Sequence, residues 1–367
     1  MIIETGILAL LTGILLAATL LSFLKVAHGF VRSFSFPRIQ MLVLAIALVP
    51  FTLLLVGGGW LWTLLLAQAV VIVVQVVAIA RFTPLWKTQS KAYCGSPDDP
   101  NTVCIMSSNV KMSNRDYARA VELARKIDPD VAVFMETDQA WVDALMTLSE
   151  KWPNVVSHPL DNAYGMILFS RLPLDDAEVN YLVLDEVPSF QATVTLRDGQ
   201  RFRFHSVHPE PPVPYLDSAG RDAELLRVAD IVKAEALPSI VTGDLNDVAW
   251  SHTTRLFQRV SRLLDPRVGR GFYNTFDARY FFLRWPLDHL FHDARFALIE
   301  MRRLPYIGSD HFPMYFKLAL TGSAAGVDMP APEDAEDREE KREIQKEGDE
   351  LDREAIGIDW ESEAADR

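Results

Sequence analysis

Three long apolar runs fill the first eighty residues and constrain the fold more than any other feature. They cover residues 2–27, 39–56 and 60–80, and each carries almost no charge until its edge. Each is close to the roughly 20 residues that a helix needs to cross a bilayer. Runs that are apolar on every face fit poorly with the buried helices of a soluble domain. We therefore expect three transmembrane helices, a membrane domain over residues 1–81, and an integral protein of the cell membrane.

The first run differs from a cleaved signal peptide. It lacks a basic start, carries Glu4 instead, and is followed by two further runs. Only "GGGW" separates the second run from the third, which predicts a tight helical hairpin. Trp60, Trp62 and Trp86 lie at the ends of the runs, where amphipathic rings prefer the headgroup zone of a bilayer.

The orientation in the membrane stays open at this level. Basic residues lie after the first run and after the third, two crossings apart and so on one side: Lys25, Arg32, Arg38, Arg81, Lys87 and Lys91. The positive-inside rule places that side in the cytoplasm. Cys94 and Cys104, the only cysteines, would make sense as a disulfide in an oxidising compartment, which points the other way. Two unrelated thiols are at least as consistent with the sequence.

The charge is unevenly placed along the chain. The net charge is -13, but residues 328–367 hold 17 acidic and 6 basic residues, which leaves 32 acidic and 30 basic in the rest. The acidity therefore belongs to the end of the chain, and we expect residues 321–367 to form an acidic, disordered tail. Turn formers and polar residues predict a linker over residues 82–101.

Residues 102–320 have the pattern of a folded α/β domain. Short apolar strands such as "TVCIMSSNV", "DVAVFMET" and "SIVTGDL" are interspersed with a few amphipathic helices such as "YARAVELARKI". This mixture predicts two β-sheets packed face to face with helices outside.

Polar side chains stand where many of these strands reach a loop. They are Asn109, Glu136, His208, Asp244, Asn246, Asp288, Asp310 and His311. Each alone has a structural explanation, because Asp and Asn favour turns and an acidic residue such as Glu136 stabilises the first turn of a helix. If the strand ends meet, however, the same residues line one pocket rich in carboxylates, amides and imidazoles.

The ordered set of motifs resembles a known family. "SSNVKMSN", "VAVFMETD", "YGMILFSR", "HSVHPEPP", "VTGDLND", "LDHLF" and "GSDHFPMYF" look like the successive motifs of the endonuclease/exonuclease/phosphatase superfamily. The resemblance covers residues 102–320, and "GDLND" with the later "SDH" is its most specific part. It implies a four-layer α/β sandwich, in which two packed mixed sheets are flanked by helices, and hydrolysis of a phosphoester with Mg²⁺ or, as a substitute, Mn²⁺.

The resemblance also implies a role for each residue. Glu136 is similar to the metal-binding glutamate, with Asn109 and Asp310 helping to hold the metal. His311 resembles the histidine that contacts the scissile phosphate, and Asp288 the carboxylate that orients it. Asp244 resembles the residue that aligns or deprotonates the attacking water, while Asn246 and His208 would bind phosphate oxygens. His208 lies in "HPEPP", a context that differs from other branches of the family, so its role rests on the least support.

General chemistry independently explains why such residues would be collected. Magnesium prefers hard oxygen ligands, which Glu136 and Asp310 supply. A histidine held by an aspartate, as Asp288 could hold His311, keeps one tautomer and a stabilised protonated form. Asp244 needs only to lie near water and the metal to act as a base.

Three interpretations of the function remain open. We expect a phosphodiesterase that is nuclease-like, although no basic stripe for a nucleic acid backbone is visible. The alternative is a phosphodiesterase or phosphatase for lipid headgroups, since the chain is tied to a bilayer. Aromatic residues within 271–285 could contact a base or a membrane, although core packing is the more common role. A catalytically silent, membrane-anchored binding module is disfavoured by the complete polar set, and no protein partner is predicted.

Overall fold

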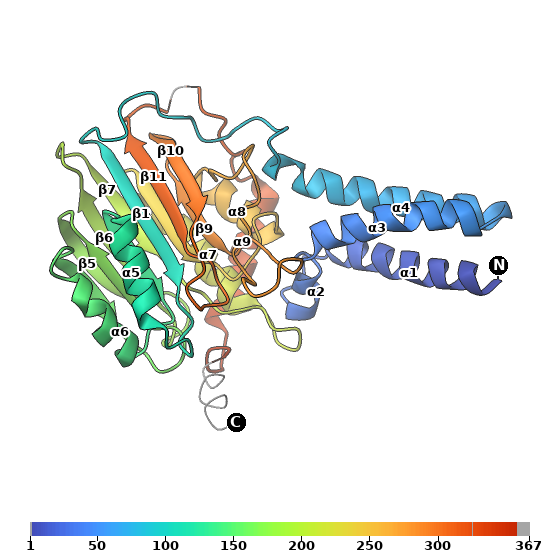
Figure 1. The fold of residues 1–367 in the computed structure, drawn as a ribbon, viewed down its shortest axis with the longest axis horizontal. Coiled ribbons are helices and arrows are strands. Elements are labelled where there is room, and N and C mark those ends of the chain that lie inside the picture. The colour runs from blue at the N-terminus through green and yellow to red at the C-terminus, as the bar shows by residue number, and fades with distance from the viewer. Residues whose placement is uncertain (1, 325, 358–367) are drawn as a thin grey trace.

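A computed structural model describes residues 2–324 and 326–357. Three apolar helices form an arm that projects to one side of a rounded domain (Figure 1). They are α1 (Ile2–Leu21), α3 (Arg38–Leu55) and α4 (Gly58–Ile79), the last continued by the short helix η1 (Ala80–Phe82). Each is long and apolar enough to be a candidate membrane span.

Polar side chains inside the arm pair with one another across the helices. The Gln68 amide donates hydrogen bonds to the hydroxyls of Thr12 and Thr52, at 3.1 and 2.8 Å, and Gln75 donates to the Thr19 hydroxyl at 2.9 Å. All five side chains are buried. Hydrogen bonds of this kind hold helices together where the surroundings are apolar.

The strands of the rounded domain form two mixed sheets. One has the order β10-β11-β1-β2-β4-β3, with β1 and β2 parallel, and the other the order β5-β6-β7-β8-β9, with β7 and β8 parallel. The strands of the first sheet are β1 (Thr102–Asn109), β2 (Val131–Met135), β3 (Asn154–His158), β4 (Met166–Ser170), β10 (Phe296–Arg303) and β11 (Met314–Leu320). Those of the second are β5 (Leu174–Tyr181), β6 (Pro188–Thr195), β7 (Arg201–Ser206), β8 (Ser239–Asp244) and β9 (Asp288–His292).

The layers follow from which side chains pack together. Inward side chains of both sheets, such as Ile105, Phe204 and Ile240, share one buried cluster. A second cluster joins the outer face of the first sheet to α5 (Tyr117–Ile127), α6 (Gln139–Leu145) and the short η2 (Met146–Leu148). A third joins the second sheet to α7 (Ala219–Ala234) and α8 (His252–Ser261). The order helix, sheet, sheet, helix confirms the expected α/β sandwich.

Two strands lie outside the sequence prediction. They are β3 and β5, and each forms an edge of its sheet. Their side chains are half-buried or exposed along almost the whole strand. Edge strands need little apolar burial, so "LDDAEVNY" in β5 lacks the alternation that marks a half-buried strand.

The expected disordered tail differs from the structure over its described part. Residues Ala335–Asp349 form helix α9, which packs along α7 and buries Ile344. Its charges are paired, since Arg259 of α8 contacts Asp337 at 2.6 Å and Lys341 contacts Asp230 of α7 at 2.6 Å. Basic residues on both partners offset the acidity that had indicated disorder. Residues 358–367 of the expected tail lie outside the described residues.

The base of the arm packs directly on the sandwich. A short helix, α2 (Gly29–Ser33), follows the first span, and its buried Arg32 pairs with Asp222 of α7 at 2.9 Å. The indole of Trp250 donates to the Ser35 carbonyl at 2.7 Å and packs with Ile79 and Phe82 at the end of α4. Trp250 lies six residues after Asp244, so the arm contacts the segment that follows the "GDLND" motif.

Buried histidines in the second sheet give a prediction about acid stability. Burial lowers the pKa of His205 and His289 to about 3 and that of His292 to about 4. Below pH 6.5, the usual histidine pKa, these histidines therefore bind protons in the unfolded chain but not in the folded chain. The free energy of unfolding consequently falls as the pH drops toward 4. We expect the free energy of unfolding, measured with urea, to fall less steeply between pH 6.5 and 4.5 in His205→Leu than in the wild-type protein. The difference in slope should correspond to the uptake of about one proton on unfolding. Equal slopes in both proteins would contradict this.

The two cysteines are free thiols in the structure. Cys94 is exposed in the segment between the arm and β1, and Cys104 is half-buried in β1. The disulfide considered from the sequence is therefore absent from the described residues. It gives no argument for placing the domain in an oxidising compartment.

Candidate active site

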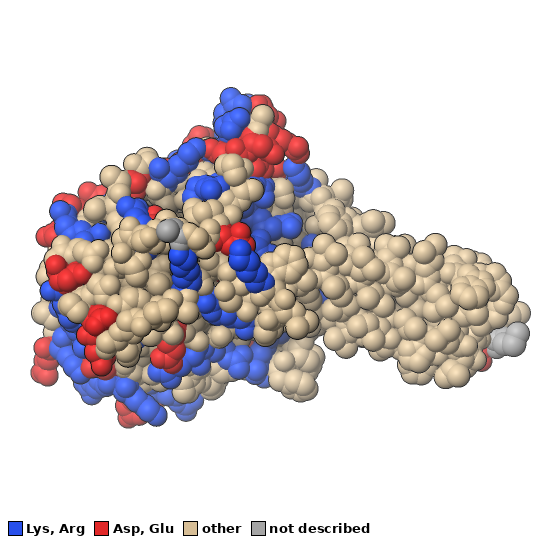
Figure 2. Space-filling view, turned by 90° about the horizontal axis from the view of Figure 1, so that it is seen from above, with Lys and Arg blue, Asp and Glu red and all other residues tan. Residues whose placement is uncertain are grey.

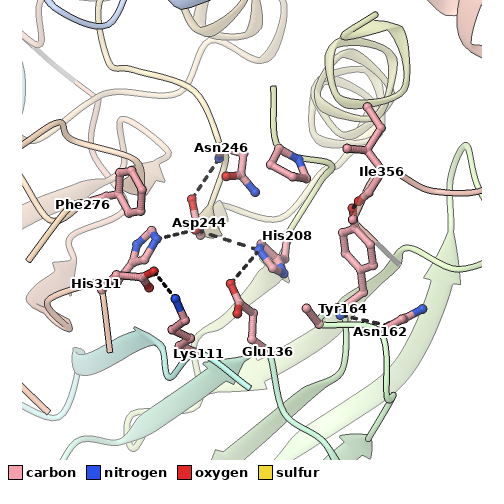
Figure 3. A pocket seen from close by; sticks show the side chains of 14 residues that line it. Lys111, Glu136, Asn162, Tyr164, His208, Asp244, Asn246, Phe276, His311 and Ile356 are labelled. Atoms are coloured by element: carbon pink, nitrogen blue, oxygen red, sulfur yellow. Dashed lines mark hydrogen bonds and ion pairs between the residues drawn. The ribbon is translucent and has the colours of Figure 1, made fainter. Parts of the chain in front are cut away.

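One cavity of about 300 Å³ lies where strand ends of the two sheets meet. Glu136 follows β2 of the first sheet, while His208 follows β7 and Asp244 ends β8 of the second. Asp310 and His311 precede β11. Figure 3 shows Glu136, His208, Asp244 and His311 pointing toward one another around the cavity.

Gly243 allows β8 to end so close to β7. Its φ is +146°, and a Cβ atom there would lie 1.9 Å from the Val207 carbonyl oxygen. Glu136 and Asn246 also have positive φ angles, of 60° and 50°. Non-glycine residues adopt this region at a cost of roughly 1–3 kcal/mol each, and such strain clusters at functional sites.

Asn109 connects the two sheets at the floor of the cavity. Its amide nitrogen donates to Glu136 Oε1 at 2.5 Å and to Asp244 Oδ2 at 3.1 Å. Its oxygen accepts from the backbone N–H of Lys111 at 3.0 Å. Asn109 is buried, so these bonds fix the two carboxylates relative to each other.

His311 lies between two aspartates. Its Nδ1 is 2.8 Å from Asp288 Oδ2, and its Nε2 is 3.3 Å from Asp244 Oδ2. All three side chains are buried. Burial disfavours the charged imidazolium, but the two carboxylates outweigh it and raise the pKa of His311 to about 10. His311 is therefore protonated at neutral pH.

His208 has the opposite charge state. Its Nε2 lies 3.9 Å from both Glu136 Oε1 and Asp244 Oδ2, too far for a hydrogen bond. Burial lowers its pKa to about 4, so the ring is neutral at pH 7. Within the described residues its Nδ1 has no hydrogen-bond partner. The ring lies beside that of Tyr164 in a tilted arrangement, with centroids 5.6 Å apart.

The Glu136 carboxyl is held in a crowded anionic pocket. Burial first, and then the charges of Asp310 and Asp244, raise its pKa to about 7, although Asn109 and His311 oppose the shift. A divalent cation would relieve this repulsion, and carboxylate and amide oxygens are the ligands that magnesium prefers. The donor set of Glu136, Asp310 and Asn109 therefore fits such an ion.

The site also contains a second set of possible metal ligands, which shares no residue with the first. Asp244, Asp288 and His311 bring ligand atoms within 4.8 Å of one another. However, both ring nitrogens of His311 already contact these aspartates, Nδ1 at 2.8 Å from Asp288 and Nε2 at 3.3 Å from Asp244, so a metal would have to displace one of these contacts. This set therefore suits a proton-holding triad better than a metal.

Lys111 is a cavity residue that the sequence reasoning missed. Its ammonium lies 2.7 Å from Asp310 Oδ2, and Arg279 lies 3.7 Å from the same oxygen. Burial disfavours the charged ammonium, but Asp310 outweighs it and raises the pKa of Lys111. The signal was available, because Lys111 lies two residues after Asn109 inside "SSNVKMSN".

Residues 356 and 357, the last that the structure describes, form another wall that the sequence did not indicate. Ile356 and Gly357 line the cavity opposite Phe276, and the Tyr164 hydroxyl donates to the Ile356 carbonyl. Arg353 holds this C-terminal segment in place through ion pairs with Glu210, at 2.6 Å, and Asp217, at 3.0 Å. Ile356 itself is only 4% exposed.

All the residues expected from the sequence converge here. Glu136, His208, Asp244, Asn246, Asp310 and His311 line the cavity, while Asn109 and Asp288 support them from behind through hydrogen bonds. Asn246 is anchored by a 2.9 Å hydrogen bond to the Pro209 carbonyl, next to His208. The arrangement combines carboxylates for a cation, a protonated histidine and the firmly held Asp244 carboxylate around one solvent space.

Comparison with known proteins gives three findings. A model of the Endonuclease/Exonuclease/phosphatase family matches residues 106–311. No curated protein sequence matches the chain. Solved structures with the same fold include a humanized D. rerio TDP2 with 14 mutations and D. rerio TDP2 complexed with a single-strand DNA product. Each is 19% identical with a TM-score of 0.50, and each pairs 59% of this chain with 99% and 98% of its own. A mannosyl-6-phosphatase of Bacteroides thetaiotaomicron is 17% identical, with a TM-score of 0.48, over 59% of this chain and 99% of its own.

Proposed function

The chain belongs to the endonuclease/exonuclease/phosphatase family, and we propose that it is a membrane-anchored, divalent-metal-dependent hydrolase of phosphodiesters. The observation that carries the proposal is the convergence of Glu136, Asp244, Asp310 and His311 on one cavity from strands of both sheets. Members of this family are hydrolases that act on phosphoesters, and the cavity holds the charges that such a reaction needs.

The proposed domains follow the sequence prediction with one change. Residues 1–81 anchor the protein in the cell membrane as an integral protein, residues 82–101 link, and residues 102–320 are the catalytic domain. The candidate spans support the anchor. Residues 335–357 add a helix and a cavity wall to the catalytic domain, since α9 packs on α7 and Ile356 lines the cavity.

We assign metal binding to Glu136 and Asp310, with Asn109 in support. The bound ion, Mg²⁺ or Mn²⁺, would neutralise negative charge on the phosphate oxygens. Lys111 now balances Asp310 at 2.7 Å, and it is well placed to bind a phosphate oxygen as well. Its ammonium is a compact charge on a flexible stem, which suits both contacts.

Asp244 is the proposed general base. It is ionisable, buried and fixed by Asn109 and the Asn246 N–H, the latter at 3.0 Å. A fixed carboxylate can align a water molecule and accept its proton as the water attacks phosphorus. Because His311 is cationic, it stabilises the charge that develops on the non-bridging oxygens. Asp288 orients His311, and neutral His208 and Asn246 bind further phosphate oxygens.

The substrate is proposed to be a nucleic acid, with a lipid headgroup as the alternative. A product complex of one relative contains single-strand DNA, which supports the first. The second is favoured by a specific observation: Phe281 and Phe282 are 82% and 58% exposed on a loop at the base of the arm. A catalytically silent binding module remains the third possibility, with no protein partner proposed.

A substrate panel tests the proposal. We expect the full-length protein in detergent to release p-nitrophenol from bis(p-nitrophenyl) phosphate with Mg²⁺ or Mn²⁺, and to lose this activity in EDTA. Plasmid nicking and headgroup release from mixed micelles then separate the nuclease from the lipid hydrolase. No turnover of any phosphoester with either metal would support the binding module instead.

A further inference from the structure

An exposed aromatic loop lies beside the arm. Tyr280, Phe281 and Phe282 are 49%, 82% and 58% exposed, which is unusual for consecutive large apolar side chains. The sequence had suggested core packing for this run, and the structure excludes it for these three residues. Contiguous exposed apolar side chains of this kind mark interaction sites.

The position of the loop relative to α3 identifies the partner of this site. The Gln40 amide donates to the Phe282 carbonyl at 3.0 Å, and Gln40 lies in the first turn of α3, inside the candidate span Arg38–Leu55. Phe36, just before α3, packs edge-on against Trp285 at the other end of the loop, with centroids 5.9 Å apart. A span that begins at Arg38 therefore brings the loop to the bilayer surface.

Other apolar side chains lie exposed where the helices of the arm meet the domain. Phe23 and Phe30, between α1 and α3, are 57% and 50% exposed, and Leu85 and Trp86, after η1, are 96% and 53% exposed. In Figure 2 the arm is almost free of charged side chains, and Lys and Arg side chains begin where it joins the domain. An uncharged arm with an aromatic and basic base matches the layers of a membrane interface.

Two cations flank the loop. Arg284 and Arg303 both lie over the Phe312 ring, at 5.0 and 4.3 Å from its centroid. Their guanidinium groups donate hydrogen bonds to backbone carbonyls, those of Asp277 and Ala278 for Arg284 and that of Asn274 for Arg303. Basic residues beside exposed aromatics favour the headgroup region of an anionic bilayer.

We propose that Tyr280, Phe281 and Phe282 form a docking surface for the headgroup region of the bilayer that holds the arm. Docking would bring the candidate active site to the membrane, because the same loop reaches it. Phe276 lines the cavity with its ring 4.9 Å from that of His311, and Arg279 lies 3.7 Å from Asp310. The inference rests on the membrane-anchored part of the proposed function, but not on catalysis.

A site-directed fluorescence experiment tests it on the full-length chain in nanodiscs of phosphatidylcholine and phosphatidylglycerol. The background carries Cys94→Ser, since Cys94 is exposed, and keeps Cys104, where burial raises the pKa of the thiol and limits its reaction with the dye. Phe281→Cys is labelled with NBD. Leu54→Cys in α3, 81% exposed, is the bilayer control, and Tyr181→Cys in β5, 43% exposed, is the solvent control.

We expect spin-labelled lipid to quench NBD at 281 far more than at 181, and iodide in the buffer to do the reverse. Lipid quenching at 54 but not at 281 would overturn the docking surface while leaving the anchor intact. Absence of lipid quenching at 54 would overturn the anchor itself, and the inference with it. Quenching at 281 by added single-stranded DNA instead of lipid would assign the loop to nucleic acid. Hydrolysis of the bis-ester, measured in parallel, reports on the proposed function separately.

Discussion

Asp244→Asn is expected to lower kcat on bis(p-nitrophenyl) phosphate by about 10²–10⁴-fold, the usual contribution of a positioned general base. The amide keeps the size of the side chain and can still contact the Asn246 N–H, which the Asp244 carboxylate now accepts at 3.0 Å. It cannot take a proton from water at neutral pH. KM and Mg²⁺ affinity should change much less than kcat, because Asp244 is not among the proposed ligands.

The matched control is Asp175→Asn on edge strand β5. Asp175 is exposed and belongs to the same sheet as Asp244 but lies away from the cavity. Its kcat should equal that of the wild-type protein. An Asp244→Asn protein that folds normally and keeps more than a tenth of the wild-type kcat would remove the general base from the mechanism. Circular dichroism and the urea midpoint of both variants verify folding.

Glu136→Gln is expected to weaken Mg²⁺ binding by about 100-fold or more, since losing even an outer contact of a metal site costs about 10–100-fold. The pKa of Glu136, about 7, makes the wild-type affinity depend on pH. Below pH 7 a proton occupies the carboxyl and must leave before the metal binds. The apparent affinity should therefore rise by up to about tenfold per pH unit from pH 5.5 to 7 and level off above it.

Isothermal titration calorimetry with Mg²⁺ or Mn²⁺ between pH 5.5 and 8 measures both effects. Glu178→Gln, an exposed glutamate on β5, provides the control and should show the wild-type affinity and pH slope. In Glu136→Gln the slope should disappear together with the tight binding. A variant that retained the full pH slope would show that the titrating ligand is a different residue.

The interior of the fold could be predicted because burial leaves a pattern in the sequence. Central strands such as β2 and β4 are buried along their whole length and appear as nearly continuous apolar runs. The edge strands β3 and β5 lack this pattern because solvent contacts both of their faces. Helix α9 was not predicted for another reason. Its contacts with the domain are ion pairs and the buried side chain of Ile344, which composition alone does not reveal.

The candidate site could be predicted as far as it consists of strand ends. Asn109 and Glu136 end or follow β1 and β2, which are parallel neighbours in one sheet, and the packing of the second sheet against the first adds Asp244 at the end of β8. Tyr164 and Ile356 are 192 residues apart, and their contact depends on the path of the chain after α9. No local pattern encodes such a contact, because it follows from the docking of a helix whose partner is known only from the fold.

The C-terminal wall has a practical consequence for making a soluble enzyme. A fragment limited to residues 102–320 would keep both sheets and lose Arg353, Ala355 and Ile356, leaving Glu210 buried without its cation and one side of the cavity open. Removing the arm would in turn expose Trp250, whose indole donates a hydrogen bond to the Ser35 carbonyl. Expression trials that discard both ends would therefore yield aggregating material with altered selectivity, and the shortest useful fragment must extend through Gly357.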